Sequence, residues 1–138
     1  MDRSGFKHFL PITLRWKDND VYGHVNNVEY YSFFDTVIND FLIRVGGLDI
    51  HGGAVIGLCV ESQCTFKAPL EFPGVVDAGL RVGRVGNSSV RYDIGLFAEA
   101  ADEPAATGRF VHVFVDRADR RPVPIPDGIR QALEGISA

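Results

Sequence analysis

Residues 26–47 read NNVEYYSFFDTVINDFLIRVGG and carry the strongest helical pattern in the chain. Apolar side chains recur there at intervals of three and four, the spacing that places them on one face of an α-helix. These side chains are Val28, Tyr31, Phe34, Ile38, Phe41, Leu42 and Val45. Because Tyr30, Phe33 and Val37 widen the apolar arc, we predict a helix that is buried around most of its circumference.

Both ends of this helix carry recognisable signals. Asn26 is the predicted N-cap, since its side chain can accept a hydrogen bond from a free backbone N–H. Glu29 would complete a capping box, and Val25 and Tyr30 would form a hydrophobic staple. The Gly46-Gly47 pair is typical of a helix end, where one residue adopts a left-handed conformation.

The rest of the chain is dominated by apolar–polar alternation, which predicts β-strands. The predicted strands are residues 9–16, 56–66, 76–82, 90–96 and 107–115, and a short helix is expected from Asp127. Short turns join the last four strands and make them antiparallel. We predict an α+β fold, one domain over residues 1–138, in which a five-stranded antiparallel sheet wraps around one long central helix.

The predicted sheet has two faces, and one helix can cover only one of them. Strand 107–115 carries apolar residues on both faces, namely Phe110, Val111, Val113, Phe114 and Val115. An exposed apolar patch of this kind is normally covered by another subunit. We therefore predict a homodimer or a dimer of dimers.

Composition excludes several classes of function. The formal net charge of −4 and the pI of about 5.5 argue against nucleic-acid binding, which needs a basic surface. No apolar run approaches the roughly 20 residues of a membrane span. The first residues, Met1-Asp2-Arg3, are not followed by the apolar stretch of a signal peptide, so a cytoplasmic protein is expected.

Cysteine usage gives no indication of a disulfide or a metal. Cys59 and Cys64 are five residues apart in one predicted strand, which would place them on opposite faces of the sheet. No Cys-x-x-Cys pair or Cys/His cluster suggests zinc. We expect no metal and no redox cofactor.

The loop between the first strand and the helix carries the residues suited to chemistry. Asp20 and His24 lie immediately before a helix N-terminus, which offers free N–H groups and the positive end of the helix dipole. Thioester cleavage needs a base or nucleophile near the carbonyl carbon and donors aimed at the developing oxyanion. Asp20 could supply the first, and backbone amides from about Asn27 onward could supply the second.

The sequence RWKDND at residues 15–20, followed by GHVNN at residues 23–27 and by Tyr30, resembles the 4-hydroxybenzoyl-CoA thioesterase-like family of hot-dog proteins. The same stretch is similar to bacterial long-chain acyl-CoA thioesterases and to plant acyl-ACP thioesterases. The resemblance implies a hot-dog fold with sites across a dimer interface, a catalytic carboxylate at Asp20 and a polarising amide at Asn27.

Two departures from related patterns bear on the mechanism. The plant acyl-ACP enzymes carry Asp-x-Asn-x-His, and this chain has Tyr22 in place of the Asn, so a role for that amide side chain is not carried over. Another hot-dog branch uses a Glu from the strand after the helix, which makes Glu61 a reserve candidate. His24 either takes part in catalysis or binds a backbone group near the helix start.

The expected function is therefore hydrolysis of an acyl-CoA thioester to a carboxylic acid and CoA. Arg81, Arg84 and Arg91 either form a solvated face or bind the CoA phosphates, to which guanidinium groups are suited. Alternatives are an acyl-carrier-protein thioesterase and a non-catalytic acyl-CoA-binding module. A dehydratase of the same fold is less favoured, because its Asp-x-x-x-x-His pattern is absent.

Overall fold

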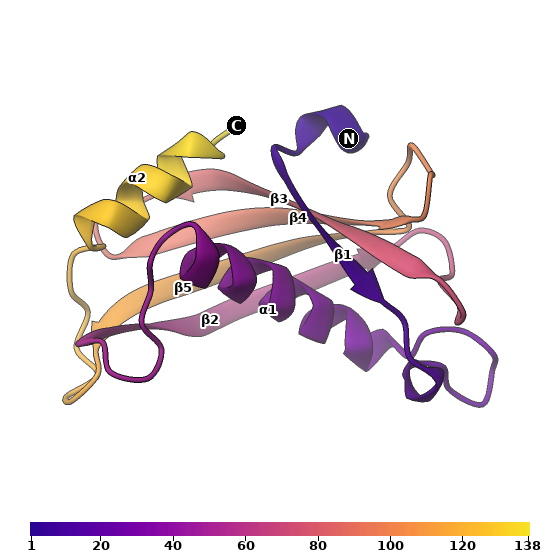
Figure 1. The fold of residues 1–138 in the computed structure, drawn as a ribbon, viewed down its shortest axis with the longest axis horizontal. Helices are drawn as coiled ribbons and strands as arrows, with labels where there is room; N and C mark the ends of the chain where they lie inside the picture. Colours follow the sequence, from indigo (N-terminus) through magenta and orange to yellow (C-terminus); the bar gives the residue numbers. More distant parts are fainter.

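The computed structural model describes residues 1–138 and has the predicted α+β architecture of an antiparallel five-stranded sheet with helices (Figure 1). The main elements are β1 (His8–Thr13), α1 (Asn27–Arg44), β2 (Val55–Phe66), β3 (Val75–Val85), β4 (Ser89–Ala98), β5 (Ala106–Asp116) and α2 (Asp127–Gly135). Short 3-10 turns lie at Arg3–Gly5 and Trp16–Asp18. The first strand ends earlier than predicted, because Trp16 turns out of the sheet. Its ring is 77% exposed and packs edge-on against Phe72, with the centroids 5.8 Å apart.

The strand order is β1-β3-β4-β5-β2, with every neighbouring pair antiparallel. Strand β5 therefore lies inside the sheet, and its apolar residues pack largely within the chain. Phe110, Phe114 and Val115 are buried, and Val111 and Val113 are half-buried. The prediction that this strand exposes an apolar patch is wrong, because the order of the strands could not be inferred from the sequence.

Helix α1 crosses one face of the sheet (Figure 1), and only its sheet-facing side is buried. The buried residues are Tyr30, Phe33, Phe34, Val37, Ile38, Phe41 and Leu42. Val28, Tyr31 and Val45 remain exposed, so the helix is not enclosed around most of its circumference as predicted. The reason is that nothing in the chain covers the side of α1 that faces away from the sheet.

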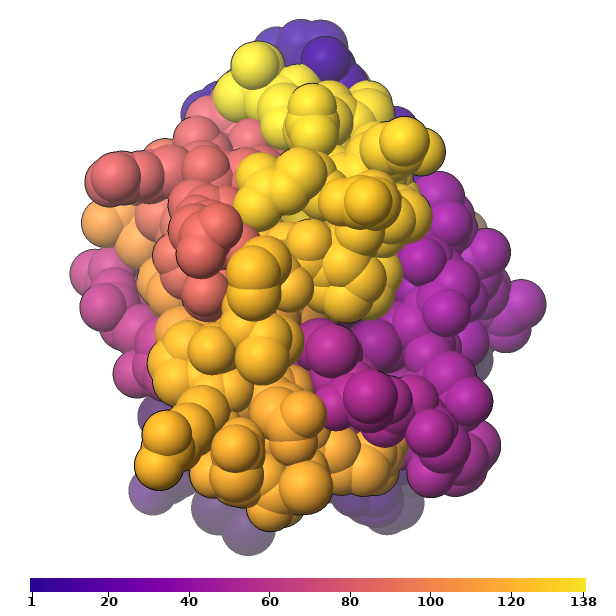
Figure 2. All heavy atoms as spheres, turned by 90° about the vertical axis from the view of Figure 1, so that its left-hand side faces the viewer, coloured from indigo at the N-terminus to yellow at the C-terminus, as the bar shows by residue number.

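Helix α2 extends the same core beyond the C-terminal end of α1. Its residues Ile129 and Leu133 join the core cluster of the main sheet. The C-terminal segment closes this end of the molecule (yellow in Figure 2) beside the loop that follows α1. Neither α1 nor α2 has the length and apolar character needed to cross a membrane.

The predicted N-cap and the predicted glycine end of α1 are confirmed, whereas the capping box is not. Asn26 is the N-cap, and its Oδ1 accepts a hydrogen bond from the Val28 N–H at 3.0 Å. Gly47 has a φ of 74°, the left-handed conformation expected after a helix. The capping box is wrong, because the Glu29 carboxylate instead pairs with the Arg15 guanidinium at 3.6 Å.

The N-terminal segment covers part of the face opposite α1. Phe6 packs edge-on against Phe97, with ring centroids 5.8 Å apart. The close approach of Phe6 requires glycine beneath it, since a Cβ at Gly79 or Gly95 would lie 2.9 or 2.8 Å from the ring. The Arg3 guanidinium fixes the segment by pairing with Asp77 at 2.9 Å.

A β-bulge in β2 changes the predicted placement of the two cysteines. The register shifts between Cys59 and Glu61, so that Cys59 pairs with His112 and Cys64 pairs with Gly108. His112 and Gly108 are four residues apart on β5, so they lie on the same face of the sheet. Gly108 lies beneath Phe34 of α1, so both cysteines are on the α1 side rather than on opposite faces. Both are free thiols. The four-residue offset of their partners along β5 corresponds to roughly 13 Å, which is too far for a disulfide.

His112 is a buried titratable group on the core side of β5. Its side chain is 2% exposed, and the Tyr92 Oη lies 3.2 Å from its Nδ1. Burial lowers the pKa of His112 from 6.5 to about 4, because the imidazolium ion would lose its hydration.

We expect acid to destabilise the protein through His112. Its pKa is lower in the folded chain than in the unfolded chain, so the unfolded chain takes up the proton first. The stabilisation is complete above pH 6.5 and is lost as the pH falls toward 4. Between about pH 7 and about pH 5 the free energy of unfolding should fall by about 2 kcal/mol more in the wild type than in His112→Gln. Urea unfolding of both proteins at both pH values measures this difference, and equal pH dependences would contradict the prediction.

Candidate active site

The loop from Asp18 to Asn26 is held closed at its base by Asp18. This side chain is fully buried, and its carboxylate accepts hydrogen bonds from the Arg15 backbone N–H at 2.7 Å and the Arg15 guanidinium at 3.0 Å. The Asp18 carbonyl accepts a hydrogen bond from the Asn26 N–H at 2.8 Å. Asp18 therefore has a structural role, which is to fix where α1 begins.

Asp20 and His24 lie opposite each other across a tight turn. The Asp20 N–H donates to the His24 carbonyl at 3.0 Å, and the Gly23 N–H donates to the Asp20 carbonyl at 3.1 Å. Gly23 has a φ of 86°, which favours glycine. The Asp20 Oδ1 accepts a hydrogen bond from the Tyr22 N–H at 2.9 Å, while no protein donor is bound to its other carboxylate oxygen.

A cavity of about 320 Å³ opens beside this turn at the N-terminus of α1. It is lined by His24, Val25, Asn27, Tyr30, Phe66, Lys67, Ala68 and Pro69. The Tyr30 ring packs edge-on against Phe66, with centroids 4.9 Å apart, and burial raises the pKa of its hydroxyl. The cavity thus combines an apolar wall with a helix N-terminus.

The first residue of α1, Asn27, lines this cavity and has a free backbone N–H. The Asn27 N–H finds no acceptor within the chain, whereas the Val28 N–H is capped by Asn26 and the Glu29 N–H donates to the Asn26 carbonyl at 2.9 Å. A free N–H at the positive end of a helix dipole is suited to an oxyanion.

The predicted catalytic residues are only partly brought together. His24 and Asn27 line the cavity, and Asp20 lies across the turn from His24 without lining it. Glu61 pairs with Val111 in the sheet and lies on the face opposite α1, which removes it from this cavity. Lys67 lines the cavity and was missed, because nothing in the sequence shows that the end of β2 meets the start of α1.

The three predicted phosphate ligands lie elsewhere. Arg81 and Arg91 are on the sheet face opposite α1, and Arg84 is exposed beside Arg91. The three arginines lie close to one another, but none of them lines the cavity that contains Asn27 of the same chain. No group of three or more His, Cys, Asp or Glu side chains is arranged to hold a metal ion.

We expect Asn26→Ala to lower the free energy of unfolding by roughly 1 kcal/mol, since it removes the N-cap of α1. Thioester turnover should fall as well, because the same cap sets the direction of the Asn27 N–H. Asn87→Ala, at an exposed loop position, is the matched control and should change neither quantity. Thermal unfolding and kcat of the two variants would test this, and unchanged turnover in Asn26→Ala would show that the start of α1 has no part in the chemistry.

Comparison with known proteins identifies the family of the chain. The family model of the thioesterase-like superfamily matches residues 14–133. The PA5185 protein from Pseudomonas aeruginosa strain PAO1 is 56% identical, with 99% of this chain and 96% of that chain covered and a TM-score of 0.98. The PA2801 protein of Pseudomonas aeruginosa, named as a candidate thioesterase, is 32% identical, with 91% and 96% of the chains covered and a TM-score of 0.84.

A more distant structure shows the same fold. A 1,4-dihydroxy-2-naphthoyl-CoA thioesterase from Synechocystis is 16% identical, with 91% of this chain and 93% of that chain covered and a TM-score of 0.81. None of the curated proteins matches the chain. The sheet and helices are consistent with the hot-dog fold implied by the sequence motif. Because the family model spans most of the chain and the PA2801 protein, named as a candidate thioesterase, is 32% identical over 91% of this chain, the protein belongs to the thioesterase-like superfamily and is a thioester hydrolase.

Proposed function

We propose that the protein hydrolyses acyl-CoA thioesters at the N-terminus of α1. The observation that carries this proposal is the free Asn27 N–H at a cavity of about 320 Å³, next to the turn that holds Asp20 and His24. A donor at a helix N-terminus and a nearby carboxylate are the two groups that acyl transfer to water needs.

In the proposed reaction, Asp20 removes a proton from a water molecule as the water oxygen attacks the thioester carbonyl carbon. The negative charge that develops on the carbonyl oxygen is stabilised by the Asn27 N–H and by the dipole of α1. The C–S bond then breaks, and the sulfur takes a proton to leave as the CoA thiol. Direct attack by Asp20, followed by hydrolysis of the resulting anhydride, gives the same products.

His24 has a supporting role in this proposal. Its exposed imidazole lies at the cavity, across the turn from Asp20. There it can orient the attacking water or donate a proton to the departing sulfur. The proposal invokes no metal or redox cofactor.

We further propose that the working unit is a homodimer formed along β2. This strand has 12 residues and lies at the edge of the sheet, where its outer backbone groups have no partner strand. Such an edge readily pairs with another chain. Val60 and Phe66 are 61% and 48% exposed on it. Because Phe66 also lines the cavity, this dimer would put the active site next to the subunit interface.

A charge on the β2 edge should therefore separate the subunits. We expect Val60→Glu to shift the assembly toward monomers and to lower turnover per chain, because the carboxylate would be buried without a partner. Val45→Glu, at an exposed position at the end of α1, is the control. Mass measurement by sedimentation and turnover across a dilution series test this, and a monomeric variant with full activity would refute the shared site.

The proposed substrate class is tested with a panel of acyl-CoAs, both aromatic and aliphatic and of different chain lengths, alongside acyl-carrier-protein and acyl-pantetheine thioesters. We expect at least one acyl-CoA to be hydrolysed with a higher kcat/KM than any acyl-carrier-protein thioester. A higher kcat/KM for an acyl-carrier-protein thioester would show that the acyl group is delivered by the carrier protein rather than by CoA. Binding of acyl-CoA without turnover of any thioester would point to a ligand-binding module instead.

A further inference from the structure

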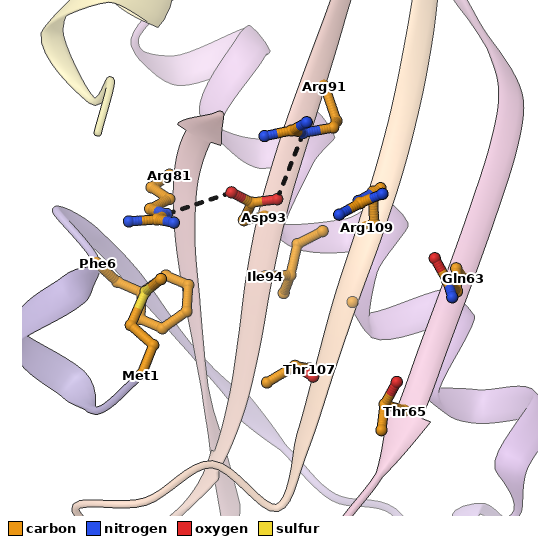
Figure 3. Close-up of a pocket in the computed structure, with 11 residues that line it drawn as sticks. Met1, Phe6, Gln63, Thr65, Arg81, Arg91, Asp93, Ile94, Thr107 and Arg109 are labelled. Atoms are coloured by element: carbon orange, nitrogen blue, oxygen red, sulfur yellow. Dashed lines mark hydrogen bonds and ion pairs between the residues drawn. The ribbon is translucent and has the colours of Figure 1, made fainter. Parts of the chain in front are cut away.

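A second cavity, of about 410 Å³, lies on the sheet face opposite α1 and is richer in charge than the catalytic cavity (Figure 3). Its polar lining comes from neighbouring strands. These residues are Arg81, Arg91, Asp93, Thr107, Arg109, Gln63 and Thr65. Phe6 and Met1 of the N-terminal segment form an apolar wall beside them.

The strand register places these groups in rows across the sheet. Asp93 of β4 pairs with Arg81 of β3 on one side and with Arg109 of β5 on the other, and Arg109 pairs with Gln63 of β2. Directly opposite residues in an antiparallel sheet have side chains about 5 Å apart. The row therefore presents two guanidinium groups, one carboxylate and one amide on a single surface.

The cavity holds three arginines and one carboxylate, which leaves an excess of positive charge. The Arg81 Nε donates to Asp93 Oδ2 at 3.3 Å. The Arg91 Nε lies 3.7 Å from Asp93 Oδ1, too far for a hydrogen bond, and this buried nitrogen has no hydrogen-bond partner. The Arg109 guanidinium forms neither an ion pair nor a hydrogen bond within the chain. With Asp93 ionised, the group carries two net positive charges in a chain whose overall charge is −4.

Gly83 on β3 leaves the space that Arg91 occupies. A Cβ at this position would collide with the end of the Arg91 guanidinium and would lie 2.8 Å from Asp93 Oδ2. The side chains that would be displaced are flexible ends rather than backbone. The arrangement of Arg91 and Asp93 therefore depends on the absence of a side chain at Gly83.

We propose that this cavity binds the phosphate groups of a small molecule with at least two negative charges. Guanidinium groups bind phosphate oxygens through paired N–H donors, and the Thr65 and Thr107 hydroxyls and the Gln63 amide add neutral donors. The volume lies within the usual range of ligand cavities, roughly 300–1,000 Å³. The site does not depend on the thioesterase proposal, since it lies on the other face of the sheet from Asn27.

Calorimetric titration of the whole chain with pyrophosphate tests the proposal. We expect saturable binding that weakens as the salt concentration rises. Arg109→Gln should lower the affinity about 10- to 100-fold, because it removes a charged donor. Arg121→Gln removes the same charge from an exposed position in the segment after β5, outside the cavity, and should change the affinity little.

Gly83→Ala separates geometry from charge, because it keeps every arginine and displaces the Arg91 guanidinium. We expect a folded protein whose pyrophosphate affinity is reduced. Absence of binding to the wild type would overturn the proposal, as would equal affinity in the wild type, Arg109→Gln and Gly83→Ala. The proposal would also be overturned if Arg109→Gln lowered the mass of the assembled protein and left the pyrophosphate affinity unchanged. The arginines would then hold subunits together rather than bind phosphate.

The phosphate groups could belong to CoA or to a free nucleotide, and titrations with CoA and ATP together with KM measurements distinguish the two. If the ligand is the nucleotide end of CoA, CoA should bind more tightly than ATP, and Arg109→Gln should raise KM for acyl-CoA but not for acyl-pantetheine. If the ligand is a free nucleotide, ATP should bind at least as tightly as CoA, and Arg109→Gln should leave KM for acyl-CoA unchanged. Either result supports a phosphate site.

Discussion

Replacement of Asp20 by Asn is expected to lower kcat for the best thioester substrate about 100- to 10,000-fold. The change keeps the size of the side chain and removes the charge that would accept a proton or attack the carbonyl. The turn should persist, because an Asn Oδ1 can still accept the hydrogen bond from the Tyr22 N–H. Steady-state kinetics together with thermal unfolding would show a loss of turnover without a loss of stability.

Asp18→Asn is the matched control, because it makes the same chemical change two residues away. Asp18 is buried and bound to Arg15. Its replacement should reduce the free energy of unfolding and affect turnover mainly through the position of the loop. An Asp20→Asn variant with near-native kcat would remove Asp20 from the mechanism. His24 would then be the next candidate base, since Glu61 lies on the other face of the sheet.

The largest expected effect on stability comes from Phe34. Its side chain is fully buried between α1 and the sheet, directly over Gly108 of β5. We expect Phe34→Ala to lower the free energy of unfolding by about 3–5 kcal/mol, because it removes a buried ring and leaves a cavity. Denaturant unfolding of the wild type and the variant measures this loss. A loss below about 1 kcal/mol would mean that α1 is not seated on β5 at this point.

The fit between Phe34 and Gly108 can be tested separately by a double-variant cycle. Gly108→Val alone should destabilise the protein by about 1–3 kcal/mol, since the added side chain would collide with the Phe34 ring. In the Phe34→Ala background the same valine should fill part of the vacated space. We expect the two changes to be non-additive by at least about 1 kcal/mol in the direction of rescue. Strict additivity would show that the two residues do not meet.

The sequence predicted the local structure of this chain better than its long-range arrangement. Helix α1 was found from its spacing and from Asn26, because a cap acts on residues next to it in the chain. The bulge near Cys59 was not predictable, since it depends on how β2 aligns with β5. A single extra residue there moved Cys64 to the other face. The interior position of β5 likewise depends on strand order, which short-range patterns do not encode.

The candidate site shows the same limit. His24 and Asn27 were found because they are adjacent to a helix start, and they do line one cavity. Lys67 and Arg109 were missed, because each joins its cavity through strand pairing between distant parts of the chain. Arg84 of β3 lies next to Arg91 of β4, as the sequence suggested. It nevertheless lies outside the cavity that Arg81 and Arg91 line.

The position of Trp16 gives the protein an intrinsic fluorescent probe at a useful place. It is the single tryptophan of the chain, it lies in the turn that leads into the loop of Asp20 and His24, and most of its ring is in water. Its emission should therefore respond to events at that loop, such as the arrival of a substrate or a neighbouring subunit. The same exposure makes the ring a poor reporter of the core, because its surroundings change little when Phe34 and its neighbours come apart. A flat fluorescence trace during denaturation would thus describe the probe rather than the stability of the fold, and circular dichroism is the better measure of unfolding.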